Sequence, residues 1–154
     1  MDREKRTLLT SPPSAVIHKS NLMIPLEYLN DLTYEIRGAA MEVYNELGPG
    51  LLESVYENAL IHEFKLRDIE VASQIPVNVI YKGALVGNDL RVDLLVDDTV
   101  ILELKSIEEL KKVHYKQLRT YLKLLNKPQG WLINFGEGDF SKGMIKLDNY
   151  NFHL

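Results

Sequence analysis

Three charged residues interrupt two short apolar runs near the middle of the 154-residue chain. The runs span residues 91–96 and 100–105, and they carry Asp93, Glu103 and Lys105 where a buried strand would carry aliphatic side chains. Charged groups on a core strand cost free energy unless they are paired or hold a metal. A divalent cation between the carboxylates would compensate for that cost, so these residues form a candidate metal site.

The pairing of the two runs, which read as a β-hairpin, decides whether the charges share one face of the sheet. A two-residue turn would pair Asp93 with Leu102 and send Glu103 to the other face. A three-residue loop over residues 97–99 would pair Asp93 with Glu103 and bring both carboxylates to the side of Lys105. We predict the three-residue loop, because a single site requires it. The alternative is a solvent-facing polar edge in which Lys105 neutralises a carboxylate.

The helix expected over residues 107–125 directs further polar groups towards this hairpin. At about 100° per residue, His114, Gln117 and Tyr121 lie on one face together with two leucines. That face should look inward, so Gln117 and Tyr121 would point towards the sheet. A single buried Tyr or Gln is usually a satisfied core residue. Two of them four residues apart, after a charged hairpin, indicate a site.

A basic stripe runs along the opposite side of the same predicted helix. Its members are Lys112, Lys116, Arg119 and Lys123. Such a stripe suggests a nucleic-acid groove, but this one points away from Gln117 and Tyr121. We therefore expect it to be a solvated helix face.

Two helices are predicted before the hairpin, over residues 30–47 and 51–67, with Gly48-Pro49-Gly50 ending the first one. Glu53 shares a face of the second helix with Tyr56 and further apolar residues, so we expect its carboxylate to point inward. A carboxylate in that position must be compensated by another group. The alternative is a first-turn carboxylate favoured by the helix dipole.

The remaining elements predict an α/β fold with a mixed central sheet flanked by helices. Further strands are expected over residues 74–81, 131–135 and 144–147. Pro76 cannot donate a ladder hydrogen bond, so the first of these should lie at an edge or have the proline at its beginning. Residues 1–25 show no clear period and are expected to form a partly ordered N-terminal arm. Residues 26–154 would then be one domain, and the chain is long enough to bury a real core.

Composition and charge restrict the class of protein further. The content of 45% hydrophobic and 26% charged residues is ordinary for a soluble globular protein. The absence of cysteine excludes a disulfide, a thiolate metal site and a cysteine nucleophile. No apolar run approaches the roughly 18 residues of a membrane span and no signal-peptide pattern is present, so a cytoplasmic location is expected. The net charge of −4 argues against a strong non-specific nucleic-acid binder.

Three motifs, within about residues 30–147, resemble those of the PD-(D/E)xK nuclease superfamily. Asp93 followed by Glu103-Leu104-Lys105 resembles the superfamily core. Gln117-x-x-x-Tyr121 is similar to the extra motif of its RecB and lambda-exonuclease-like branch. The segment Gly50-Leu-Leu-Glu53-Ser-Val-Tyr56 resembles the signature of the small GxxExxY proteins, which are grouped in this superfamily.

The resemblance implies a restriction-endonuclease-like αβββαβ core with an extra N-terminal helix and a metal-dependent site. In it, Asp93, Glu103 and the Leu104 carbonyl would bind Mg²⁺ or Mn²⁺, hard cations that prefer oxygen ligands. Lys105 would orient the attacking water or stabilise the charge developing on the phosphate. Glu53 would complete the acidic cluster, directly or through water.

The resemblance also implies that Gln117 and Tyr121 orient the catalytic face or touch the DNA backbone. Three carboxylates in one pocket repel each other without a cation, so raised carboxylate pKa values are expected in the metal-free protein. Two functions stay open, a metal-dependent nuclease acting on DNA or RNA and a catalytically silent binding or regulatory module with the same fold. The sequence leaves the oligomeric state open, although a small nuclease domain often needs a homodimer or larger complex to hold a duplex.

Overall fold

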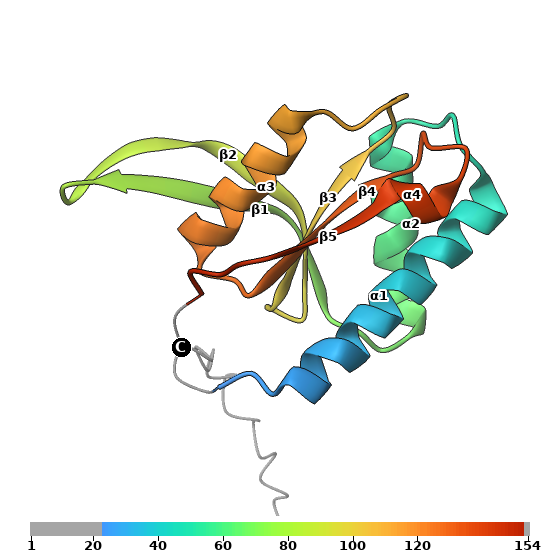
Figure 1. Cartoon of the computed structure of the whole chain (residues 1–154), viewed down its shortest axis with the longest axis horizontal. Helices are drawn as coiled ribbons and strands as arrows, with labels where there is room; N and C mark the ends of the chain where they lie inside the picture. Colours follow the sequence, from blue (N-terminus) through green and yellow to red (C-terminus); the bar gives the residue numbers. More distant parts are fainter. Residues whose placement is uncertain (1–22, 153–154) are drawn as a thin grey trace, which may run out of the picture.

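The computed structural model describes residues 23–152, and Figure 1 shows how their helices and strands are arranged. Most of the arm expected over residues 1–25 therefore lies outside the described residues. The described elements are, in order, α1 (Leu26–Leu47), α2 (Glu53–Leu66), β1 (Val71–Tyr81), β2 (Ala84–Val96), β3 (Val100–Lys105), α3 (Lys112–Leu125), β4 (Gln129–Asn134), α4 (Phe140–Gly143) and β5 (Met144–Asp148).

The five strands form one sheet in the order β1-β2-β3-β4-β5. β3 and β4 pair in parallel and are connected through α3, whereas the other neighbouring strands pair antiparallel. Helices α1 and α2 cover one face of the sheet and α3 covers the other (Figure 1). This mixed sheet flanked by helices confirms the predicted fold class.

Each face of the sheet has its own hydrophobic core, because successive side chains of a strand point to opposite faces. Leu102 and Leu104 of β3 pack with α1 and α2, whereas Ile101 packs with α3. Glu103 follows the parity of Ile101, so its side chain lies on the α3 face. The functional part of the fold is therefore the layer between β3 and α3.

The β1–β2 hairpin is longer than the sequence pattern predicts, and it extends beyond the helices in Figure 1. β1 forms one edge of the sheet, with Pro76 paired to Arg91 of β2. The predicted edge position of the proline strand is confirmed. The remainder of the hairpin leaves Asp93 near its base, where β2 enters the layered part of the molecule.

Two helix boundaries differ from the predictions. α1 begins at Leu26, directly after Pro25, and not near residue 30. α3 begins at Lys112 and not near residue 107, because the preceding segment forms a loop that is fixed to the end of β4. The buried Asn134 accepts a hydrogen bond from Ile107 N (3.1 Å) and donates one to Ile107 O (2.9 Å).

Gly136 allows this loop to approach β4 closely. A Cβ at this position would lie 2.2 Å from Ile107 O, which is backbone and cannot give way. Gly136 N donates to Asn134 Oδ1 at 3.1 Å, so the same amide holds both segments. The chain leaving β3 is consequently held in one conformation immediately after Lys105.

Candidate active site

The loop between β2 and β3 has the three residues that one shared site requires. Val96 pairs with Val100 and Leu94 with Leu102, which leaves residues 97–99 as the loop. Thr99 N donates to Val96 O at 2.9 Å and closes it. The predicted loop length is confirmed, and so is the register from Leu94 to Val96, but the ladder ends before the predicted Asp93–Glu103 pair.

The two carboxylates of the hairpin meet through the backbone of the opposite strand. Asp93 N donates to Glu103 Oε1 at 3.2 Å, and Leu104 N donates to Asp93 Oδ2 at 2.7 Å. These side-chain bonds follow directly after the Leu94–Leu102 pair, where a regular ladder would continue with backbone bonds. Asp93 and Glu103 therefore converge at the point where β2 and β3 separate.

A bend in β2 produces this arrangement. Val92 packs in the α3 core although Leu94, two residues later, packs in the core of α1 and α2. In the neighbouring strand Gln74 has a φ of 52°, a conformation that is uncommon for a residue other than glycine. Local irregularities of this kind are frequent beside active sites, where they redirect a side chain. Here the bend directs the Asp93 carboxylate towards β3.

Burial and mutual repulsion raise the pKa of both carboxylates. Burial, and after it the charge of Asp93, raise the pKa of Glu103 to about 8. Burial also raises the pKa of Asp93, against the hydrogen bond from Leu104 N. Raised carboxylate pKa values were expected for the metal-free protein, and these two residues bear out that expectation. Without a cation, the pair does not carry two full negative charges at neutral pH.

Lys105 ends β3 beside the carboxylate pair. Its charge lowers the pKa of both Asp93 and Glu103, but less than burial raises them. Its carbonyl accepts a hydrogen bond from Phe135 N at 2.7 Å, so β4 holds its backbone. Lys105 is half-buried, and its side chain starts from a fixed backbone next to the pair.

Gln117 and Tyr121 of α3 face the sheet, as their helical positions predict. Tyr121 is only 2% exposed, and Gln117 Nε2 donates to its hydroxyl at 3.0 Å. Burial raises the pKa of Tyr121, and the charges of Glu103 and Asp93 raise it further. The phenol is therefore an un-ionised group that lies within electrostatic reach of both carboxylates.

His114 occupies the same face of α3, one turn before Gln117. Its Nδ1 accepts a hydrogen bond from Lys111 N at 2.9 Å. Burial lowers the pKa of His114, and the nearby charges of Lys105 and Lys111 lower it further. The imidazole is thus neutral at physiological pH, and the first turn of α3 lies close to Lys105.

Glu53 does not point inward, and that expectation is wrong. It is exposed in the first turn of α2, whereas Tyr56, Leu60 and Phe64 are fully buried. A residue in the first turn of a helix can lie on the same helical face as these buried residues and still be outside the core, because the core ends before that turn. Its charge nevertheless raises the pKa of both Asp93 and Glu103. Glu53 therefore faces the site from its solvent side.

Tyr56 explains why the segment from Gly50 to Tyr56 has a defined shape. Its hydroxyl donates to Gly48 O and accepts from Leu51 N at 3.1 Å, which closes the turn between α1 and α2. Its ring stacks on Phe135 with 4.2 Å between the ring centroids. Ser106 Oγ donates to Leu51 O at 2.6 Å and connects this turn to the chain leaving β3. The turn therefore positions Glu53 relative to the hairpin.

Glu57 belongs to the surroundings of the site and was missed in the sequence. Its charge raises the pKa of Asp93 and ranks ahead of Lys105 and Glu53 among the charges acting there. Gln74 Nε2 donates to both of its carboxylate oxygens, at 3.1 and 3.0 Å. The available signal was its spacing of four residues from Glu53, which places the two carboxylates on one side of α2.

The donor atoms at the carboxylate pair suit a hard divalent cation. Leu104 N points towards Asp93, and the N–H and C=O of one strand residue point to the same side, so the Leu104 carbonyl also faces this side. Within residues 23–152, no group of three or more Asp, Glu, His or Cys side chains is arranged to hold a metal. The fitting donor set is therefore Asp93, Glu103 and the Leu104 carbonyl, with Glu53 too exposed to complete a closed cluster.

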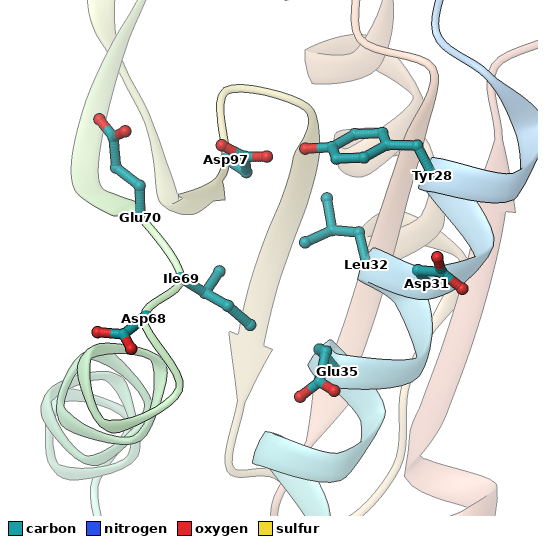
Figure 2. Close-up of a pocket in the computed structure, with 8 residues that line it drawn as sticks. All are labelled: Tyr28, Asp31, Leu32, Glu35, Asp68, Ile69, Glu70 and Asp97. Atoms are coloured by element: carbon teal, nitrogen blue, oxygen red, sulfur yellow. The ribbon is translucent and has the colours of Figure 1, made fainter.

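A cavity of about 380 Å³ at the other end of the hairpin has a different character. Figure 2 shows its lining residues, which are Tyr28, Asp31, Leu32, Glu35, Asp68, Ile69, Glu70 and Asp97. Five of these eight residues carry carboxylates, and Asp97 belongs to the loop at the opposite end of β3 from Lys105. A phosphate chain would be repelled from such a lining. This cavity is therefore separate from the carboxylate pair and unsuited to nucleic acid.

Comparison with known families agrees with the geometry of the carboxylate pair and its surroundings. The family model of the PD-(D/E)XK nuclease superfamily matches residues 30–147, and the chain belongs to this superfamily. The five-stranded mixed sheet with flanking helices is consistent with its restriction-endonuclease-like α/β fold. Membership implies a nuclease-type function, with nucleic acid as the substrate, and divalent metals are usual in such enzymes.

No curated protein and no solved structure shows a significant match to the chain. Between residues 23 and 152, none of the helices has the length and apolar character that a membrane span requires.

Proposed function

We propose that the protein is a metal-dependent nuclease of the GxxExxY group that hydrolyses phosphodiester bonds of DNA, with RNA as the other substrate to test. The observation that supports this function is the hydrogen bonding between Asp93 and β3, which brings the half-buried carboxylate of Asp93 and the buried carboxylate of Glu103 together, both with raised pKa values. Two ionised carboxylates so close repel each other. Bound Mg²⁺ or Mn²⁺ would stabilise both of them in the ionised form.

The residues around the pair have distinct proposed roles. Asp93, Glu103 and the Leu104 carbonyl would hold the cation, which lowers the pKa of a bound water and polarises the scissile phosphate. Lys105 would orient the attacking water or stabilise the charge on the phosphate. Glu53 would contribute through water, because its side chain is exposed.

Gln117 and Tyr121 would position the reacting groups from the α3 side. The Gln117–Tyr121 hydrogen bond holds the phenol in place, and the raised pKa of Tyr121 keeps its proton available for donation to a phosphate oxygen. His114, which is neutral, would accept or donate a hydrogen bond without adding charge. These side chains would close the site against water on one side.

The test is a cleavage assay with Mg²⁺ or Mn²⁺ on linear, circular and single-stranded DNA and on RNA. We expect the wild-type protein to cut at least one of these substrates and Asp93→Asn to cut it roughly 100-fold more slowly or not at all, since it loses a metal ligand. Asp89→Asn is the matched control, because Asp89 is an exposed carboxylate on the same strand, and it should cut like the wild type. Equal cleavage by the Asp93→Asn and wild-type proteins would contradict the proposal.

A catalytically silent binding or regulatory module is the second candidate. It is favoured by the lack, in the described residues, of a group of three acidic or histidine ligands around a metal. This function predicts that the protein binds nucleic acid but leaves all four substrates of the cleavage assay intact. Cleavage that depends on Asp93 would exclude it.

A further inference from the structure

The outer face of α3 is a concentration of positive charge in a chain whose net charge is −4. Lys112, Lys116, Arg119 and Lys123 fall within about 60° of arc at about 100° per residue, and all four are exposed. The ion pairs found among residues 23–152 involve none of these four side chains. Their exposure agrees with the expectation of a solvated face. The absence of carboxylate partners leaves this face, here called the basic face, available to a polyanion.

A cavity of about 250 Å³ lies at the C-terminal end of the basic face. Its lining includes Arg119 and Lys123 of α3, Asp148, and Tyr150, which is 88% exposed. The charge of Asp148 is offset by Lys146, whose Nζ lies 3.8 Å from its carboxylate. The turn that carries Tyr150 is fixed, because Asn149 Nδ2 donates to Leu122 O at 3.2 Å and to Lys127 O at 2.9 Å. An exposed aromatic side chain on an anchored turn thus lines the same cavity as Arg119 and Lys123.

The opposite end of the basic face adjoins the candidate active site. The charges of Lys105 and Lys111 both act on His114, so the first turn of α3, which contains Lys112, lies next to the end of β3. From Lys112 to Lys123 the helix rises about 16 Å, at 1.5 Å per residue. The face therefore leads from the site to Tyr150.

We propose that the basic face and Tyr150 bind a single-stranded stretch of nucleic acid that continues from the site. Cations that follow a phosphate backbone, together with an aromatic ring on which an unpaired base stacks, are the features of single-strand recognition. A duplex keeps its bases stacked on each other, so Tyr150 would have no base to contact. The carboxylate-lined cavity of Figure 2 repels the same strand and helps to direct it to α3.

The choice of nucleic acid as the bound polymer rests on the proposed nuclease function. The test measures binding without cleavage. Fluorescence anisotropy would measure the binding of a labelled oligothymidylate to the full chain in EDTA. With four phosphate contacts, the slope of log K against log salt should be about −2.8, and Lys116→Gln/Arg119→Gln should reduce it to about −1.4. At 0.1 M salt this double variant should bind roughly 20-fold more weakly. Lys65→Gln/Lys142→Gln removes two exposed cations elsewhere and should bind like the wild type.

Tyr150→Ala separates stacking from charge. It should weaken binding about tenfold without changing the salt slope, because it removes a stacking platform and no charge. A duplex of the same length should bind more weakly than the single strand and should not respond to Tyr150→Ala. Equal losses in both double variants, or no effect of Tyr150→Ala, would overturn the proposal. Asp89→Asn removes an exposed carboxylate outside the site and should bind the oligonucleotide like the wild type. Binding is measured in EDTA, where no metal-dependent cleavage occurs, so failure of the cleavage assay and failure of the binding assay can be told apart.

Discussion

Glu103 has the most unfavourable environment of the candidate residues. It is 3% exposed, and its pKa is raised from 4.5 to about 8 by burial and by Asp93. A carboxyl group whose pKa is raised on folding binds its proton more tightly in the native state. The stability it supports is complete below about pH 4.5 and is lost as the pH rises towards 8. Asp93, whose pKa is also raised, acts in the same direction.

We predict that Glu103→Gln removes much of this pH dependence. Between pH 5.5 and 8.5 the metal-free wild type should lose on the order of a few kcal/mol of unfolding free energy, at about 1.4 kcal/mol for each pH unit between the two pKa values. The variant carries a neutral amide in place of the carboxyl group, so its loss should be clearly smaller. Urea denaturation at several pH values in EDTA would measure both.

The control for this measurement is Glu46→Gln, at an exposed carboxylate of α1. Its unfolding free energy should follow the wild type at every pH. The prediction fails if Glu103→Gln loses as much stability as the wild type over the same range. Such a result would mean that the Glu103 carboxyl group is ionised at neutral pH without a cation.

At the scale of elements, the position of the site depends on how the chain leaves β3. The amide of Asn134 at the end of β4 makes three hydrogen bonds, two with Ile107 and one with Gly136 N. The turn before α2 is connected to the same region through Ser106 and Leu51. Three elements distant in sequence are therefore held together immediately beyond Lys105.

We predict that Asn134→Ala destabilises the protein by about 2–4 kcal/mol. The amide is fully buried, so its loss leaves backbone groups of Ile107 and Gly136 unsatisfied in the interior. Asn88→Ala, at an exposed position of β2, should change the unfolding free energy by less than about 0.5 kcal/mol. Urea denaturation of the three proteins is the measurement. A change below about 1 kcal/mol in Asn134→Ala would show that water replaces the amide there.

The bend of β2 at Asp93 is the second feature of this scale. A regular antiparallel ladder would leave the Asp93 backbone paired with Glu103 and its carboxylate pointing out of the sheet. The bend instead allows Asp93 Oδ2 to accept from Leu104 N, in the plane of the sheet. The bend therefore brings the two carboxylates together, more than the regular alternation of side chains between the two faces of the sheet does.

At the scale of the whole molecule, charge is distributed unevenly over a chain of net charge −4. The carboxylate-lined cavity lies at the loop end of the β2–β3 hairpin, and the basic face covers the outside of α3. The candidate site lies between the sheet and the inner face of α3. A phosphate chain would approach from the α3 side, where repulsion is least.

We predict that Mn²⁺ stabilises the whole fold through this one site. A ligand present at 100 times its dissociation constant adds about 2.7 kcal/mol to the stability of the state that binds it. The wild type and Asp89→Asn should therefore melt several degrees higher with Mn²⁺ or Mg²⁺ than in EDTA. Asp93→Asn should show little of this shift in a thermal unfolding experiment. An equal shift in Asp93→Asn and the wild type would remove Asp93 from the metal site.

Much of this architecture follows from local patterns in the sequence. Apolar periodicity was sufficient to indicate the three long helices and the five strands, although not α4 or the starts of α1 and α3. Pro76 was sufficient for the edge position of β1. The need for one shared face correctly indicated the three-residue loop at residues 97–99. The spacing of Gln117 and Tyr121 was enough to direct both towards the sheet, because helical geometry determines which side chains share a face.

Contacts between distant segments were decided by the tertiary structure alone. The start of α3 depends on hydrogen bonds between Asn134 and Ile107, 27 residues apart, which no local pattern records. Glu53 is exposed because none of the elements described between residues 23 and 152 covers the first turn of α2. Glu57 acts on Asp93 only because α2 packs near β1 and β3. Periodicity reports which residues share a face of one element. What lies opposite that face, and so the electrostatic environment of Asp93 and Glu103, results from packing between elements.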